Sequence, residues 1–143
     1  MRPVLFLDID GVLKRPGGES PWDNYSCQLV REFADEIDAL ICITSTWRLT
    51  HPLAFFQQAI SQRVLACTES DEESCRRDRN QRDSLVRAFL ASRYDAPPPH
   101  VIVDDDRHAF ANTEQVVFIE PGCTLRPSDL VKAHQVLQAQ IRG

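Results

Sequence analysis

The sequence lacks long apolar runs and lacks an excess of positive charge. Its apolar stretches span only a few residues, too short for a helix that crosses a bilayer, so no membrane partner is expected. The 16 lysines and arginines are outnumbered by 21 aspartates and glutamates, which gives a net charge of −5. This balance excludes nucleic-acid binding through bulk charge, although a local basic patch remains compatible with it. The N-terminal apolar stretch is too short for a signal peptide and has no cleavage site.

Cysteines with the Cys-x-x-Cys spacing of zinc sites are also missing. The chain has an odd number of cysteines, spread along its length: Cys27, Cys42, Cys67, Cys75 and Cys123. This pattern is typical of reduced thiols in a cytoplasmic protein and speaks against a zinc site. Cys42 lies inside an apolar run and is expected to be buried.

What is present is the composition of an ordinary globular domain. The 143 residues are 43% hydrophobic and 26% charged, which excludes a disordered tail, a collagen-like chain and a coiled coil. The length fits one domain, and no linker or internal repeat divides it. We therefore expect a single domain over residues 1–143.

Short apolar runs alternate with segments of helical periodicity. Strands are expected at 4–7, 40–43, 64–67, 100–103 and 116–119, and helices at 29–37, 52–60, 85–90 and after Ser128. Ser128 is expected to cap the last helix, with Leu130, Val131, His134, Leu137 and Ile141 on its apolar stripe. The charged stretch 69–79 is interpreted as a solvated loop. The fold class is α/β, a central parallel sheet with helices on both faces.

Polar clusters directly follow three of the expected strands. They are Asp8-Ile9-Asp10-Gly11, Thr44-Ser45-Thr46 and Asp104-Asp105-Asp106. Ligands of parallel α/β sheets bind at the carboxyl ends of the strands, where these clusters would meet. Gathered carboxylates repel each other unless a divalent cation neutralises them, and aspartate oxygens suit Mg²⁺. The pattern therefore indicates magnesium-assisted phosphoryl chemistry with an aspartate available as nucleophile.

These segments resemble the motifs of the haloacid dehalogenase (HAD) superfamily. The stretch from Phe6 to Leu13 resembles its first motif, Ile43-Thr44-Ser45 its second and Ile102-Val103-Asp104-Asp105 its fourth. The run Thr44-Ser45-Thr46-Trp47-Arg48 is similar to a signature of the HAD domains of Swiss Army knife RNA-repair proteins. The resemblance extends from Val4 to about Ile119 and implies a Rossmann-like HAD fold.

The resemblance also implies the role of each site residue. Asp8 would be the nucleophile and a metal ligand. Asp10 would be the general acid and then the base, and its carbonyl would bind Mg²⁺; an aspartate there implies a phosphatase or phosphotransferase. Thr44 and Ser45 would bind the phosphoryl group, with their relative roles open by one position. Asp105 would bind the metal, supported by Asp104, and Gly11 would permit a close backbone approach.

The third HAD motif needs a cation, which is commonly a lysine. The only lysines are Lys14 and Lys132, and neither lies at a suitable place in the sequence. We therefore expect an arginine in this role, Arg82 or alternatively Arg79, because a guanidinium binds phosphate oxygens well. Trp47 and Arg48 follow the phosphate-binding turn and are candidates for substrate contact.

The spacing of the motifs leaves no room for a sizeable cap domain. There are 33 residues between Asp10 and Thr44 and 36 between Ser45 and Arg82, which one or two elements and their loops consume. The site should be open, and the resemblance implies large substrates or a lid lent by a partner subunit. The substrate would be a nucleic-acid end or a nucleotide. A small-molecule phosphomonoesterase and a non-catalytic phosphate-sensing module remain alternatives, and the oligomeric state stays open.

Overall fold

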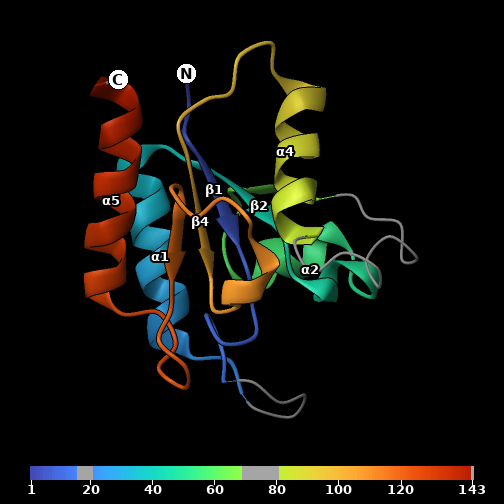
Figure 1. Cartoon of the computed structure of the whole chain (residues 1–143). Coiled ribbons are helices and arrows are strands. Elements are labelled where there is room, and N and C mark those ends of the chain that lie inside the picture. Colours follow the sequence, from blue (N-terminus) through green and yellow to red (C-terminus); the bar gives the residue numbers. More distant parts are fainter. Residues whose placement is uncertain (16–20, 69–80, 143) are drawn as a thin grey trace.

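The central feature is a parallel sheet. The structure is a computed structural model that describes residues 1–15, 21–68 and 81–142. In this part of the chain five strands pair in the order β3-β2-β1-β4-β5, all parallel (Figure 1). They are β1 (Val4–Leu7), β2 (Leu40–Ile43), β3 (Val64–Cys67), β4 (His100–Asp104) and β5 (Val116–Phe118). All five match the strands expected from the sequence to within one residue.

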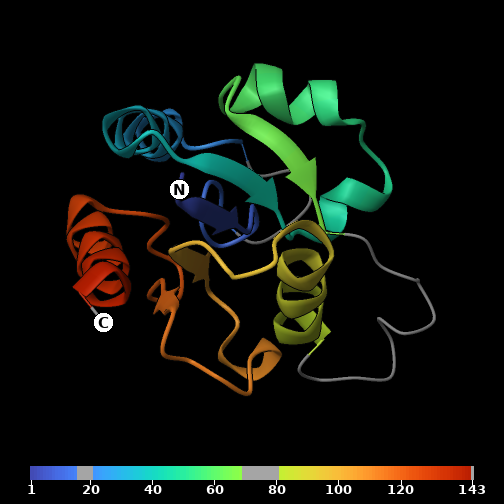
Figure 2. The same ribbon diagram turned by 90° about the horizontal axis from the view of Figure 1, so that it is seen from above.

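Helices cover both faces of this sheet, as the sequence predicts. The described residues form four α-helices, α1 (Asn24–Ile37), α2 (Leu53–Ala59), α4 (Gln81–Arg93) and α5 (Pro127–Arg142). Two short 3₁₀ turns, η1 (Thr46–Leu49) and η2 (Arg107–Ala109), follow β2 and β4. Seen from above, α1 and α5 lie on one face of the sheet and α4 lies on the other (Figure 2). The α/β fold class is therefore confirmed, with no cap domain among the described residues.

Each central strand is apolar throughout because both of its faces are buried. Leu5 and Leu7 belong to the larger core cluster, with side chains of α1, α2 and α5. Val4 and Phe6 point to the opposite face and pack with α4, where the Phe6 and Phe89 rings meet edge-on with their centroids 5.6 Å apart. The near-continuous apolar run that marks β1 in the sequence is thus the consequence of two cores, one on each side.

The last helix differs from its prediction. It begins at Pro127 rather than after Ser128, and the carboxylate of Asp129 accepts a hydrogen bond from the Arg126 backbone N–H. Proline suits the first position of a helix because it has no N–H to satisfy there. Along α5, Ala133 and Leu137 are buried, whereas Val131 and Ile141 are 59% and 69% exposed and His134 is also exposed. The apolar stripe is therefore narrower than expected.

Two further expectations can be compared with the structure. Cys42 is buried, as predicted, and Cys27, Cys42, Cys67 and Cys123 are free thiols. The predicted solvated loop at 69–79 lies outside the described residues. None of the helices in the described part of the chain is long and apolar enough to cross a membrane.

A capping aspartate fixes the start of α1 and ties it to a distant loop. The Asp23 carboxylate accepts hydrogen bonds from the backbone N–H groups of Tyr25 and Ser26 at 3.0 and 3.2 Å. Its other oxygen accepts one from the Thr124 hydroxyl at 2.9 Å. Asp23 therefore satisfies free N–H groups of the first turn and joins α1 to the segment that precedes α5.

We expect Asp23→Ala to lower the free energy of unfolding by about 1 kcal/mol, the usual cost of removing such a cap. Urea denaturation followed by circular dichroism measures this loss. Glu36→Ala is the matched control, because Glu36 is an exposed acid on the same helix. Equal stabilities of the two variants would show that the cap contributes nothing.

Candidate active site

The carboxyl ends of three neighbouring strands bring buried polar side chains to one edge of the sheet. The backbone N–H of Asp8 donates to the Val103 carbonyl, and that of Thr44 donates to the Leu7 carbonyl. Thr68, directly after β3, donates in the same way to the Ile43 carbonyl. These bonds continue the parallel ladder by one residue beyond each strand. Asp8, Thr44 and Thr68 therefore lie side by side, each no more than 2% exposed.

Three carboxylates gather at this edge. Oxygens of Asp8, Asp104 and Asp105 all lie within 4.8 Å of one another. Burial raises the pKa of Asp8 well above its usual range, and repulsion by Asp104 raises it further, while Arg82 lowers it. Burial and the charge of Asp104 likewise raise the pKa of Asp105. Such a set of hard oxygen donors fits a divalent cation such as Mg²⁺, whose charge would relieve the repulsion.

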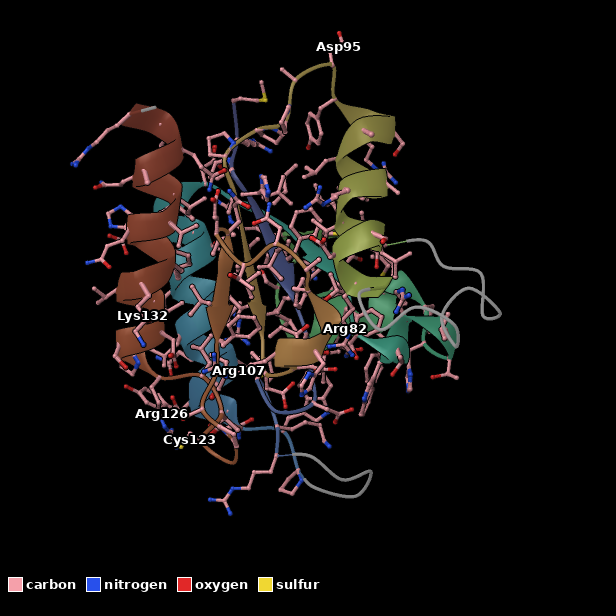
Figure 3. The ribbon with its side chains drawn as sticks, viewed as in Figure 1. Arg82, Asp95, Arg107, Cys123, Arg126 and Lys132 are labelled. Carbon is pink, nitrogen blue, oxygen red and sulfur yellow. The ribbon has the colours of Figure 1, made fainter. Side chains whose placement is uncertain are left out.

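Arg82 supplies a positive charge at the centre of the cluster. Its Nη1 atom lies 3.0 Å from Asp8 Oδ2 and 2.7 Å from Asp104 Oδ2. Burial disfavours the charge of Arg82, but the two carboxylates outweigh burial and raise its pKa. Arg82 comes from the first turn of α4, at the end that faces the carboxyl ends of the strands (Figure 3). The alternative, Arg79, lies outside the described residues.

Gly11 leaves the space that Asp105 occupies. Its φ angle is +81°, a conformation that side chains with a Cβ rarely adopt. A Cβ at this position would lie 1.9 Å from Asp105 Oδ2. The turn after β1 therefore requires glycine at position 11 for two reasons, its backbone conformation and the close approach of Asp105.

Hydroxyl groups line the other side of the cluster. The Ser45 hydroxyl accepts a hydrogen bond from the Trp47 N–H and so caps η1. The hydroxyls of Thr44 and Thr68 make no hydrogen bond, and neither does Asp8 Oδ1, although all three atoms are buried. Buried polar atoms are normally satisfied, so three of them without partners indicate a polar ligand.

Comparison with known families decides where this chain belongs. The family model described as "HAD domain in Swiss Army Knife RNA repair proteins" matches residues 4–130, most of the chain. The chain belongs to this family. A search of curated proteins and a search of solved structures gave no match. The resemblance found in the sequence is thus confirmed, and a HAD domain supports an activity of the phosphohydrolase kind on a phosphorylated substrate.

Sequence reasoning set Lys14 aside, yet the HAD domain holds it at the site. Lys14 is 1% exposed, and its Nζ atom donates to Asp10 Oδ1 at 3.0 Å. The indole Nε1–H of Trp47 donates to the other oxygen of Asp10, also at 3.0 Å. Lys14 therefore forms an ion pair with Asp10, the predicted general acid. In the sequence, this ion pair is indicated only by the position of Lys14 four residues after Asp10.

Arg48, the second residue predicted to contact substrate, binds the backbone of the HAD domain. Its Nε–H donates to the Thr68 carbonyl at 2.7 Å, and its Nη1 donates to the carbonyls of Thr44 and Ser45 at 3.1 and 2.8 Å. Arg48 therefore joins the residues that directly follow β2 and β3. Substrate contact by Trp47 or Arg48 stays a prediction. The place of Thr68 beside Thr44 becomes visible only in the fold.

We expect Arg82→Gln to reduce phosphate release by roughly 10²- to 10³-fold, as for the loss of other charge-stabilising groups in active sites. The physical reason is that Asp8 and Asp104 lose their shared cation. Arg87→Gln is the matched control on α4, because Arg87 is 61% exposed and pairs with Asp83.

Initial rates of phosphate release measure the effect, and circular dichroism checks that each variant is folded. Arg82→Lys keeps the charge and should retain more activity than Arg82→Gln. Equal losses in the Arg82 and Arg87 variants would assign the cationic role to another residue.

Proposed function

We propose that this protein is a magnesium-dependent phosphatase that forms an aspartyl-phosphate on Asp8. The observation that carries the proposal is the set of three buried atoms without hydrogen bonds: Asp8 Oδ1, Thr44 Oγ1 and Thr68 Oγ1. A phosphoryl group would accept hydrogen bonds from the two hydroxyls while Asp8 approaches its phosphorus atom. Arg82 supports the same chemistry, because it holds Asp8 Oδ2 and adds positive charge where phosphoryl oxygens would lie.

The donor set fits Mg²⁺. Asp8 and Asp105 would hold the ion together with the backbone carbonyl of Asp10. Asp104 would support these ligands without binding the ion directly, because Arg82 and the Asp106 N–H already bind its carboxylate. Bound there, the ion would neutralise the carboxylates and polarise the phosphoryl group.

The chemical steps fall to two aspartates. Asp8 attacks phosphorus, the bond from phosphorus to the leaving oxygen breaks, and its electron pair stays on that oxygen. Asp10 gives its proton to the leaving oxygen as general acid. Water then attacks the aspartyl-phosphate and loses a proton to Asp10, which frees phosphate and restores Asp8.

We infer that the substrate is the phosphorylated end of a nucleic acid or a nucleotide. The name of the family places related HAD domains in RNA-repair proteins. The described residues contain no cap over the site, which is compatible with a large substrate. A small-molecule phosphomonoesterase and a phosphate-sensing module are the other outcomes of the substrate test below.

We expect Asp8→Asn to abolish phosphate release, by about 10³-fold or more, because an amide oxygen is a poor nucleophile. The measurement is phosphate released in Mg²⁺ from a 5′- or 3′-phosphorylated oligoribonucleotide, a mononucleotide and an aryl phosphate. Asp95→Asn is the control, since Asp95 lies at the far end of the molecule from Arg82 (Figure 3).

Each result has one interpretation. Preference for the oligonucleotide supports end processing, and preference for the small esters supports a nucleotidase or a general phosphatase. No release from any ester by folded protein favours the sensing module. Retained activity in Asp8→Asn would exclude Asp8 as the nucleophile.

We expect excess EDTA to stop phosphate release and added Mg²⁺ to restore it. Asp105→Asn should raise the Mg²⁺ concentration needed for half-maximal activity about tenfold or more, because one anionic ligand is lost. Titration of activity with Mg²⁺ measures this shift, with Asp95→Asn as the control. Full activity in excess EDTA would show that the reaction does not need a metal ion.

A further inference from the structure

Both oxygens of the Asp10 carboxylate accept hydrogen bonds from other side chains. Lys14 Nζ lies 3.0 Å from Oδ1, and Trp47 Nε1 lies 3.0 Å from Oδ2. We propose that Trp47 and Lys14 are positioning residues that fix the Asp10 carboxylate for proton transfer to the leaving group. This inference rests on the proposed function, in which Asp10 is the general acid.

Asp10 needs such support because it stands at the rim of the site. Its side chain is 42% exposed, in contrast to the buried carboxylates of Asp8 and Asp104. An exposed aspartate samples several rotamers, whereas proton transfer requires the acid within hydrogen-bond reach of the leaving oxygen. Two donors from different segments restrict the carboxylate to one orientation.

Both donors are themselves fixed by their surroundings. Lys14 is buried, and its Nζ also donates to the Arg15 carbonyl at 3.2 Å. The Trp47 ring stacks on His51 with the centroids 4.9 Å apart and meets the Trp22 ring edge-on at 5.5 Å. Lys14 Nζ lies 5.7 Å from the centre of the Trp47 ring, which links the two donors. A site group is held accurately only when its supporting shell is packed in this way.

The contacts with Lys14 and Trp47 do not use the whole hydrogen-bonding capacity of the Asp10 carboxyl group. Each of its oxygens has two lone-pair positions, and each accepts one hydrogen bond from these two side chains.

The consequence is a dependence on the leaving group. When the bond from phosphorus breaks, an alkoxide must take the proton of Asp10, whereas a dinitrophenolate is stable without it. Misplacement of Asp10 should therefore slow the release of an alcohol and leave the release of dinitrophenolate nearly unchanged. A loss of folded protein would slow both reactions by the same factor.

The test compares methyl phosphate with 2,4-dinitrophenyl phosphate in single turnovers, with enzyme in excess and Mg²⁺ present. We expect Trp47→Phe to slow methanol release roughly 10- to 100-fold while dinitrophenolate release changes by less than about threefold. Lys14→Met removes the other donor and should change the ratio of the two rates in the same direction. Trp22→Phe is the matched control, because Trp22 packs against Trp47 and, among the described residues, no hydrogen bond joins it to Asp10.

The possible results separate the positioning role from the activity itself. If both rates fall by one factor in Trp47→Phe and in Lys14→Met, the positioning role is wrong while the phosphatase stands. If Trp22→Phe shifts the ratio as much as Trp47→Phe, the packing of the aromatic group accounts for the effect and the proposal is overturned. If the wild-type protein releases neither product, the proposed function fails and this inference fails with it.

Discussion

Much of this site follows from the cost of burying negative charge. Asp8 and Asp104 are almost inaccessible to water, and isolated charges in such surroundings are strongly unfavourable. Arg82 bridges them, so one guanidinium from α4 compensates two carboxylates that end neighbouring strands. Even with Arg82 in place, Asp8 Oδ1 has no hydrogen-bond partner and the Asp105 carboxylate lies close by. The carboxylates at this edge therefore outnumber the one guanidinium that binds them. A cation and a phosphoryl group are complementary to such an arrangement of charges and open donors.

A second arginine organises the opposite half of the same edge with different partners. Arg82 binds carboxylates at the ends of β1 and β4, whereas Arg48 binds backbone carbonyls at the ends of β2 and β3. The planar guanidinium suits both tasks because its several N–H groups point in fixed directions. Arg48 thus binds the backbone of Thr44 and Thr68, the two residues whose buried hydroxyls make no hydrogen bond. Both arginines therefore bind groups of the protein itself, whereas the hydroxyls of Thr44 and Thr68 have hydrogen-bonding capacity left for a ligand.

The sequence predicted the fold well because its strands are buried on both faces. Apolar runs such as Val4–Leu7 and Leu40–Ile43 have few alternatives to central strands, and the acids and hydroxyls after them identify the functional edge. Arg82 was predicted from the need for a cation, and it lies in the cluster. The prediction that Ser128 caps α5 was wrong, because the helix begins two residues earlier, at Pro127, where the Asp129 carboxylate accepts from the Arg126 N–H. That residues 1–143 form one domain stays a prediction.

Lys14 shows what linear spacing does not reveal. In the sequence it follows Asp10 by four residues and looks unrelated to Trp47, which comes 33 positions later. The turn at Gly11 folds the chain back so that the Lys14 carbonyl accepts from the Gly11 N–H at 2.7 Å, and this brings the ammonium group to Asp10. Trp47 follows β2, and it lies near Asp10 because β1 and β2 pair in parallel and end side by side. The backbone conformation of Gly11 thus brings Lys14 to the Asp10 carboxylate. This contact can be seen only in the folded chain.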